Sequence, residues 1–432
     1  MRQMKDSGIE WIDKIPHDWT ISNIKSRFAF GKGLPITKEN LVSKGLPVIS
    51  YGQIHSKSNT GTKVTSDLIR YVNENEWISY QNAIATRGNF IFADTSEDYA
   101  GCGNCAYIDK DEKIFAGYHT ILLKSLDNEN KYYAYLFLTD GWRNQVREKC
   151  AGVKLFSITQ RNLKSAIIIN PPFDEQQKIA AFLDEKCTEI DNAISKTTAS
   201  IEEYKKLKQS IITKAVTKGI RGNRPMKDSG IEWIGEIPTD WKTLRGKMLF
   251  YETNNRSDDG DEELLTVSHI TGITPRSVKN VNMFMSESLV DYKICEVGDI
   301  AANTMWLWQG AIGVSRYRGV ISPSYNTYRQ RSSFFDLTYL DYMLRIGPLV
   351  NVYKTYSTGI VASRLRLYPK DFLSIHFPVP PMQEQVELGG YLNFKCQEID
   401  KIIGRKQQLI SELEAYKKSL IYEYVTGKKE VR

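Results

Sequence analysis

Two stretches of the chain carry apolar or small residues at alternating steps of four and three. In residues 175–217 these are Leu183, Cys187, Ile190, Ile194, Thr197, Ile201, Tyr204, Ile211 and Ala215, with Lys208 as a polar interruption. In the second stretch they are Leu392, Cys396, Ile399, Ile403, Ile410, Leu413, Leu420 and Tyr424, interrupted by Lys406 and Lys417. This spacing is typical of a coiled-coil seam and predicts two helices of about 40–45 residues. Two such seams can cover each other, so we expect an antiparallel pair; pairing with another protein is the alternative.

Short runs rich in β-branched and aromatic residues precede each predicted helix. They lie at 46–51, 107–108, 118–123 and 166–169 in the first half and at 264–267, 313–315 and 374–377 in the second, with helical stretches near 131–149 and 336–353. Runs of this length bounded by turn residues are typical of strands. The pattern predicts an α/β (α+β) fold, with two globular mixed α/β domains separated by two long antiparallel coiled-coil helices.

The chain is an internal duplication. Residues 4–19 read MKDSGIEWIDKIPHDW and residues 226–241 read MKDSGIEWIGEIPTDW, with 13 of the 16 positions identical. The helical stretches repeat at a constant offset of 209, as Glu189-Ile190-Asp191 and Glu398-Ile399-Asp400 show. Each half is therefore an arm, a middle and a helix, which predicts an internal pseudo-twofold repeat. The middles, 20–170 and 242–379, are divergent, so the two halves share a framework and differ at their centres.

The charge distribution favours a polyanionic partner for the middles. The chain has a net charge of +7, of which the first middle holds 19 basic and 14 acidic residues and the second 16 and 13. A basic surface attracts nucleic acid, although ordinary scatter of charge is an equal alternative here. No apolar run of about 18 residues is present, and six cysteines in 432 residues form no disulfide framework. A cytoplasmic location is expected.

The repeated arm carries Ile9, Trp11, Ile12, Ile15 and Trp19 in the first copy and Ile231, Trp233, Ile234, Ile237 and Trp241 in the second. We interpret it as a structural staple between globule and helices, with a partner-docking surface as the alternative. Arg2 and the Lys428-Lys429 tail are expected to be solvated.

Asn170-Pro171-Pro172-Phe173 resembles the catalytic motif of adenine-specific DNA methyltransferases, in which the asparagine holds the amino group of a flipped base. A self-contained methyltransferase that uses these residues is therefore the alternative function. The duplication argues against it, because Val379 and Met382 occupy the equivalent positions of Asn170 and Phe173. Cys102 and Cys105 form a lone C-x-x-C without the second ligand pair that a zinc site needs, so no metal site is expected.

A weak correspondence between the middles selects candidate contact residues. Residues 50–54 are aligned with 267–270, residues 85–89 with 302–306, and residues 117–119 with 324–326. The framework is shared while the polar and aromatic residues differ, as expected for two surfaces that read different targets. Arginine pairs with guanine edges, and asparagine or glutamine with adenine edges, in the major groove.

The chain as a whole resembles the specificity subunit of a Type I restriction–modification system. The resemblance rests on the D-S-G-I-E-W-I opening at 6–12 and 228–234, the P-P-x-x-E-Q entry at 171–176 and 380–385, the K-x-x-E-I-D stretch at 186–191 and 395–400, and V-T-G at 425–427. It implies a target recognition domain at 1–170, a central helix at 171–218, a second target recognition domain at 219–379 and a C-terminal helix at 380–432. Each recognition domain would read one half of a bipartite asymmetric DNA site, with the helices setting the spacer.

The same resemblance implies partners and a division of labour. The partners would be double-stranded DNA, two modification (methyltransferase) subunits and two ATP-driven restriction subunits. This chain would be non-catalytic and hold no cofactor or metal, because S-adenosylmethionine, ATP and Mg would bind to the partner subunits. A coiled-coil interaction protein unrelated to DNA is a further alternative. The candidate DNA-binding residues are Ser50, Tyr51, Gln53, Arg87, Asn89, Tyr118, His119 and Lys154 in the first middle, and Ser268, His269, Asn303, Trp306, Trp308, Tyr325, Asn326 and Arg364 in the second.

Overall fold

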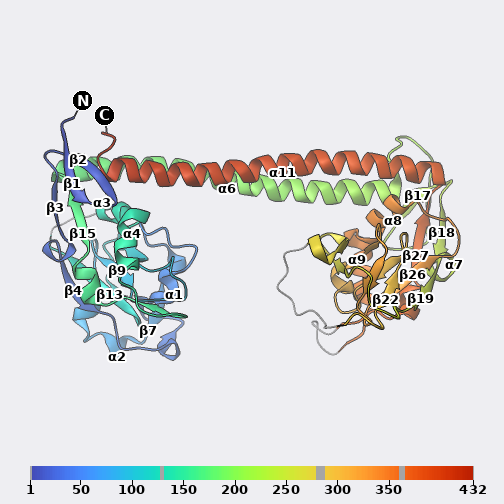
Figure 1. The fold of residues 1–432 in the computed structure, drawn as a ribbon, viewed down its shortest axis with the longest axis horizontal. Coiled ribbons are helices and arrows are strands. Elements are labelled where there is room, and N and C mark those ends of the chain that lie inside the picture. Colours follow the sequence, from blue (N-terminus) through green and yellow to red (C-terminus); the bar gives the residue numbers. More distant parts are fainter. Residues whose placement is uncertain (1, 127–130, 279–287, 360–364, 432) are drawn as a thin grey trace. The chain divides into compact units, whose positions relative to one another are not determined.

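The computed structural model describes residues 2–126, 131–278, 288–359 and 365–431. The chain folds into two compact units (Figure 1). Unit 1 comprises Met1–Lys196 and Gln408–Arg432, and unit 2 comprises Thr197–Gln407. Each unit therefore contains a globular part, the first portion of one long helix and the last portion of the other.

Both long helices form as predicted. Helix α6 spans Phe173–Lys218 with 46 residues, and helix α11 spans Met382–Val425 with 44 residues. Most of the predicted seam is buried or half-buried; Leu183, Cys187, Leu392 and Cys396 are at most 6% exposed. In unit 1 the ring of Phe182 packs against that of Tyr424, with centroids 4.4 Å apart. In the same unit Asp191 of α6 pairs with Lys417 of α11. Because the contacting residue of α11 has a lower number where the residue of α6 has a higher one, the two segments run antiparallel.

Two of the three polar interruptions of the seam form ion pairs between the helices, and the third, Lys406, lies over the Tyr204 ring. Lys417 Nζ lies 2.7 Å from the Asp191 carboxylate in unit 1, and Lys208 Nζ lies 2.7 Å from the Asp400 carboxylate in unit 2. Lys208 and Lys417 are equivalent positions of the repeat, and so are Asp191 and Asp400. A charged pair at a single seam position fixes the register of helix pairing more than it adds stability.

A four-stranded antiparallel sheet is common to both units. In unit 1 its order is β11-β9-β13-β4. The strands are Cys105–Tyr107, Phe90–Ala93, Thr120–Ser125 and Phe28–Lys32. In unit 2 the order is β24-β23-β26-β19, from Ile312–Val314, Ile300–Ala302, Asn326–Gln330 and Phe250–Thr253. The same strand order in both units confirms the shared framework that the sequence predicted.

Helices cover one face of each sheet and complete the main cores. In unit 1 these are α3, Lys131–Leu136, and α4, Asp140–Arg147; in unit 2 they are α8, Leu337–Leu344, and α9, Gly347–Tyr356. Most of their aromatic side chains are buried, as Trp142 and Tyr353 illustrate, whereas Tyr342 is half-buried and Tyr356 is exposed. The core of unit 1 also includes Leu420 and Val425 of α11.

The units differ beyond the common sheet. Unit 1 has a five-stranded sheet, β5-β7-β6-β12-β8, built from Leu41–Val42, Arg70–Val72, Leu46–Ile49, Ile114–Ala116 and Ile84–Ala85. Unit 2 has instead two two-stranded sheets, β20-β21 and β22-β25. These strands are Leu265–Ser268, Gly272–Pro275, Lys293–Cys295 and Gly319–Ile321. The variation thus lies on the face of the common sheet away from the long helices, where the smaller core clusters are.

The arms are tied to the long helices by a repeated constellation. In unit 1 the arm forms β1, Met4–Ile9, and β2, Ile12–Pro16; in unit 2 it forms β16, Met226–Asp228, and β17, Glu236–Pro238. Trp19 Nε1 donates to Glu175 Oε2 at 2.9 Å, and Trp241 Nε1 donates to Glu384 Oε2 at the same distance. These bonds confirm the structural-staple interpretation of the arm.

Arg2 belongs to this staple, so the expectation that it is solvated was wrong. Its guanidinium pairs with the carboxylates of Glu175 and Asp18, lies over the Trp19 ring, and leaves only 20% of the side chain exposed. Arg224 makes the equivalent contacts to Glu384, Asp240 and Trp241. The tail lysines are exposed, as expected, with Lys428 Nζ 3.1 Å from the Tyr422 hydroxyl and Lys429 2.8 Å from Glu423.

Each long helix ends against the globular part of the other copy. Tyr132 of α3 donates to the carbonyl of Val425 at 2.7 Å, and Tyr339 of α8 donates to the carbonyl of Val216 at 2.9 Å. Just beyond, Gly427 has φ +69°, and a β-carbon there would lie 2.5 Å from the Pro16 ring. Glycine is the residue that adopts a positive φ without strain, and here it also allows the close approach of the arm.

Candidate nucleic-acid interface

Four aromatic or imidazole rings form a cluster in unit 1, beside the ends of the two central strands of the common sheet. Tyr51 belongs to α1, Tyr51–Ile54, and its ring packs edge-on against Tyr118, His119 and His55 at 5.4–6.3 Å. Tyr118 and His119 lie immediately before β13. Burial raises the pKa of the Tyr118 hydroxyl, which therefore stays protonated and able to donate a hydrogen bond. The structure thus brings together Tyr51, Tyr118 and His119, which the sequence selected separately.

His119 is held in position by groups that the sequence analysis missed. It has φ +54°, an uncommon conformation for a residue with a side chain, and 58% of its side chain is exposed. Its Nδ1 lies 3.4 Å from Asp94 Oδ1, and Thr95 Oγ1 donates to that same carboxylate oxygen at 2.8 Å. Asp94 directly follows β9, which pairs with β13, so only the strand register shows that these residues meet. Unusual backbone conformations of this kind are concentrated at functional sites.

Ser50 and Gln53 have structural roles beside this cluster. Ser50 is fully buried at the start of α1, and its backbone N–H donates to Gln53 Oε1 at 3.2 Å. Lys154 is exposed in the loop before β14, Phe156–Ser157, whose pairing with β10, Thr95–Ser96, places the loop on the Asp94 side of the sheet. Val153 in the same loop is 91% exposed. Of this group, Lys154 is therefore free to contact a ligand, while Ser50 and Gln53 support the backbone.

Arg87 and Asn89 lie at the other end of β9, away from this cluster. Asn89 is buried, and its side chain accepts from the backbone of Thr86 at 3.3 Å, which closes the turn. Arg87 at the turn tip is half exposed and lies 3.7 Å from Asp111. Asn89 is therefore a turn residue, and Arg87 would have to contact DNA separately from His119.

The alignment of residues 85–89 with 302–306 was wrong. In unit 2 the matching turn before the sheet is 296–299, because Asp299 Oδ2 accepts from the backbone of Glu296 at 2.9 Å as Asn89 does from Thr86. Gly88 and Gly298 share a positive φ, +86° and +91°. Arg87 is thus equivalent to Val297. The alignment was wrong because the two copies of this turn share little sequence. Only the hydrogen bond that closes the turn is common to both copies.

The corresponding ends of the central strands in unit 2 carry a second polar and aromatic cluster. Asn303 directly follows β23, and its Nδ2 donates to the hydroxyl of Tyr325, which precedes β26, at 2.8 Å. Burial raises the pKa of Tyr325. Trp306 and Trp308 stack with their rings 15° from parallel and 6.4 Å apart, and Trp306 is 49% exposed. Leu307 between them is fully buried and anchors the loop.

The remaining candidates of unit 2 are more dispersed. Asn326 is buried inside β26, which makes it a framework residue. Ser268 and His269 lie at the turn between β20 and β21, where Ser268 Oγ accepts from the backbone of Ile270. Ile270 at this turn is 74% exposed. Arg364 lies outside the described residues. The first-choice contact residues here are therefore Trp306, Trp308 and Tyr325.

The Asn170 motif is built into the fold. Asn170 ends β15, Ile167–Asn170, and is 4% exposed. Its Oδ1 accepts from the Tyr133 hydroxyl at 2.7 Å, and its Nδ2 donates to Ser22 Oγ at 3.1 Å. A catalytic asparagine has to offer these same atoms to a base. Phe173 instead begins α6. This arrangement argues against the methyltransferase alternative.

The described residues contain no group of three or more His, Cys, Asp or Glu side chains arranged to hold a metal. Cys102 and Cys105 are both buried, and burial raises the pKa of the Cys105 thiol to about 12. A thiol with so high a pKa is a poor metal ligand and nucleophile, because both functions need the thiolate. Within the described part of the chain, no helix has the length and apolarity needed to cross a membrane.

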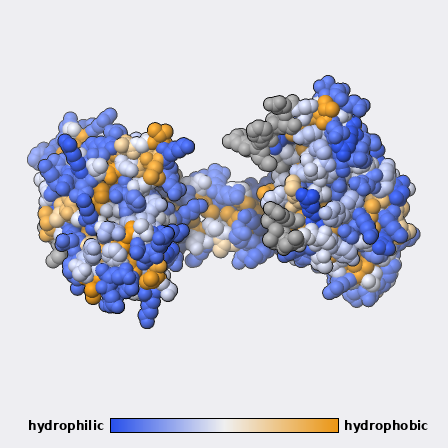
Figure 2. Space-filling model, turned by 90° about the horizontal axis from the view of Figure 1, so that it is seen from below, coloured by the Kyte–Doolittle hydropathy of each residue, from blue (hydrophilic) through white to orange (hydrophobic). Residues whose placement is uncertain are grey.

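The visible surface of each unit is largely hydrophilic, with small scattered hydrophobic areas (Figure 2). Exposed aromatic residues occur singly or in pairs, as with Trp306 and Tyr99. A surface of this kind suits a polar partner more than a large apolar one, because extended apolar patches mark obligate protein interfaces.

Comparison with known proteins finds similarity to specificity subunits. Residues 16–203 match the family model of the Type I restriction modification DNA specificity domain. A protein of Methanocaldococcus jannaschii named as the MjaX specificity subunit of a type I restriction enzyme is 25% identical, with 98% of this chain and 96% of that protein aligned. The MjaVIII specificity subunit of the same organism is 23% identical over 74% of this chain and 77% of its own length.

Two solved structures share the fold. A chain from a study of complex assembly and conformational transition of the type I R-M system has a TM-score of 0.70 and 16% identity, with 96% of this chain and 99% of that chain covered. An HsdS subunit from Thermoanaerobacter tengcongensis has a TM-score of 0.54 and 16% identity, covering 96% and 98%. Residues 16–203 therefore match a type I DNA specificity domain, and the chain is similar over nearly its whole length to type I restriction–modification specificity subunits, as the repeated motifs indicated.

Proposed function

We propose that each unit reads one half of a bipartite asymmetric DNA sequence. The observation that carries this proposal is that the loops at equivalent strand ends of the common sheet carry different side chains in the two units. The loops after β9 and before β13 carry Asp94, Tyr118 and His119 in unit 1. The loops after β23 and before β26 carry Asn303, Trp306 and Tyr325 in unit 2. One framework that presents two different sets of hydrogen-bonding and aromatic groups is what two different half-sites require.

The long helices would then fix the unread spacer and scaffold the methyltransferase subunits. The similarity to type I specificity domains and the type I R-M system named for a structural neighbour support modification and restriction subunits as partners, of which we propose two each. The chain itself would be non-catalytic and cytoplasmic, and S-adenosylmethionine, ATP and Mg would bind to the partner subunits. The engaged amide of Asn170 supports the non-catalytic assignment.

A map of methylated adenines, made with and without this gene in the host genome, tests the proposal. Loss of one bipartite asymmetric motif upon deletion is expected. The map would also supply the target sequence. Retention of every motif, or tight binding of S-adenosylmethionine by the isolated chain, would refute the proposed role.

Arg87→Ala tests the turn at the far end of β9. Arg87 is half exposed, and arginine contacts to a base edge contribute about 1–3 kcal/mol of discrimination. We expect weaker or relaxed recognition of one position in one half-site, measured by methylation of duplexes that vary at that position. Val297 occupies the equivalent turn of unit 2, so Val297→Ala is the matched control. An unchanged methylation pattern would remove Arg87 from the reading surface.

A further inference from the structure

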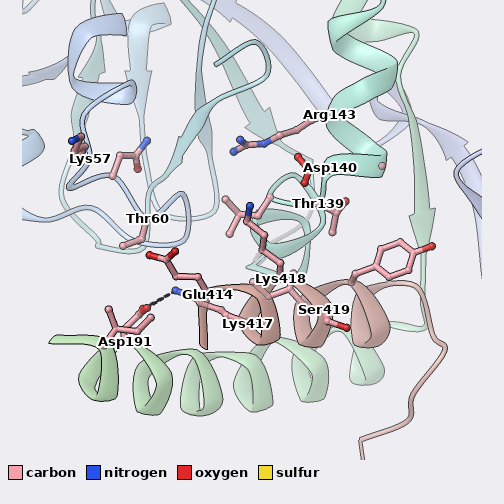
Figure 3. Close-up of a pocket in the computed structure, with 16 residues that line it drawn as sticks. Lys57, Thr60, Thr139, Asp140, Arg143, Asp191, Glu414, Lys417, Lys418 and Ser419 are labelled. Atoms are coloured by element: carbon pink, nitrogen blue, oxygen red, sulfur yellow. Dashed lines mark hydrogen bonds and ion pairs between the residues drawn. The ribbon is translucent and has the colours of Figure 1, made fainter. Parts of the chain in front are cut away.

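A cleft of about 900 Å³ in unit 1 lies between the globular part and the pair of long helices (Figure 3). Its lining comes from the loop at 57–60, from α4 and the turn before it, and from the segments of α6 and α11 in this unit. The apolar residues of the lining are Leu138, Ile194 and Ile421. The cationic residues are Lys57, Arg143, Lys417 and Lys418.

The acidic residues of the cleft are mostly neutralised. Asp191 pairs with Lys417 at 2.7 Å, and Asp140 pairs with Arg147 at 3.3 Å. Three cations, Lys57, Arg143 and Lys418, are then left with Glu414 as the one acidic lining residue outside these pairs. Among the described residues, no carboxylate lies within 4 Å of any of the three. The cleft therefore has an excess of positive charge.

Arg143 is the most informative of the three cations. Its Nε donates to the carbonyl of Phe137 at 2.9 Å, and its guanidinium points into the cleft (Figure 3). Burial lowers the pKa of Arg143, which means that its surroundings disfavour the charge. A desolvated guanidinium without an acidic partner is costly, and arginine is suited to bidentate pairing with a carboxylate or phosphate.

The second copy shows that the fold does not require these cations. Gly103 faces Arg143 Cγ at 3.7 Å in unit 1, and Gly310 faces Val350 Cγ2 at 3.0 Å in unit 2; the glycines have φ +85° and +89°. Gly103 is equally close to Val146 Cγ1, at 3.7 Å, but Arg143 and Val350 each lie nine positions before a glycine, Gly152 and Gly359, so Val350 is equivalent to Arg143. By the constant offset of 209, Gln209 is equivalent to Lys418. The same framework is built with an apolar and a neutral side chain at these two positions.

We propose that this cleft binds an acidic, partly apolar peptide segment of the modification subunit, a partner that the proposed function supplies. The cations complement acidic side chains, and Leu138, Ile194 and Ile421 offer contacts that a sugar–phosphate backbone would not use. Interfaces that combine an apolar centre with arginine are typical of protein partners. The equivalent positions of unit 2 lack the two cations, so this contact belongs to unit 1 alone.

The test measures association of the full chain with the purified modification subunit by calorimetry, at low and moderate salt. One variant, Arg143→Val with Lys418→Gln, introduces the residues of the second copy. A second variant, Lys57→Gln with Lys418→Gln, changes exposed side chains only and does not threaten folding. Lys110→Gln with Lys113→Gln is the control, since these lysines are exposed in the same unit outside the cleft.

We expect both cleft variants to weaken association about tenfold or more at low salt, with a smaller loss at moderate salt, and to leave the DNA affinity of the chain unchanged. Association equal to wild type in both variants would overturn the inference while leaving the proposed function standing. A fall in DNA affinity with unchanged association would also overturn it, because the cleft would then serve DNA phosphates. Failure of the wild-type chain to bind the modification subunit would refute the proposed scaffold role and this inference together.

Discussion

Replacement of Glu384 with alanine is expected to lower the free energy of unfolding of unit 2 by about 3–5 kcal/mol. The Glu384 side chain is 2% exposed, accepts the indole N–H of Trp241 at 2.9 Å and pairs with Arg224. Its removal leaves the buried indole N–H without its acceptor and leaves the guanidinium with Asp240 as its remaining carboxylate partner. The loss is measured by urea unfolding, with hydrogen exchange of residues 226–241 reporting on the arm of unit 2.

Glu175→Ala provides the matched comparison in unit 1. Glu175 makes the same bonds to Arg2 and Trp19 but is 21% exposed, so water can replace part of what is lost, and a cost of about 1–3 kcal/mol is expected. Glu384→Gln is the second control, since an amide oxygen can still accept from Trp241 while the charge is gone. Equal losses for the two alanine variants would show that burial does not decide the strength of the staple.

The double variant Trp306→Ala, Trp308→Ala is expected to weaken recognition of the second half-site by about 2–4 kcal/mol, roughly 30-fold or more. The two rings of the unit 2 cluster stack on each other, and Trp306 is 49% exposed. Leu307 remains as the buried anchor of the loop, so the fold should be kept. Binding is measured by competition between duplexes that vary in one half-site at a time.

Because the double variant removes no charge, the salt dependence of binding should stay as in wild type. Tyr416→Ala is the control for loss of an exposed aromatic ring, because Tyr416 lies on α11 and is 56% exposed. An equal loss of affinity for unrelated duplexes would mean that the tryptophans support DNA binding without reading sequence. Full retention of half-site recognition would remove them from the interface.

The long helices could be predicted because a heptad pattern is local and repeats over many turns. The candidate site was only partly predictable. His119 meets Asp94 through the pairing of β13 with β9, and no spacing in the sequence encodes that register. Arg87 was grouped with His119 although the two lie at opposite ends of β9.

The sequence repeat also predicts that Arg2 makes a structural contact. Arg2, Asp18 and Trp19 recur as Arg224, Asp240 and Trp241 at the same offset of 222 that relates the arms. Identity between copies at a charged residue beside the arm indicates a shared contact, and the structure shows this contact as the pairing with Glu175 and Glu384. The repeat therefore predicts framework residues well. Contact residues differ between copies and need the fold to locate them.

The composition of the units sets an order of folding. Unit 1 takes Leu420, Ile421 and Val425 into its core, so its N-terminal part cannot complete that core until residues 420–425 have left the ribosome. Unit 2 is complete once residue 407 has emerged. The N-terminal half thus folds through contacts of very high sequence separation and waits with an exposed apolar strip, the condition under which nascent chains need protection from aggregation. Loss of residues 408–432 would damage unit 1, not unit 2.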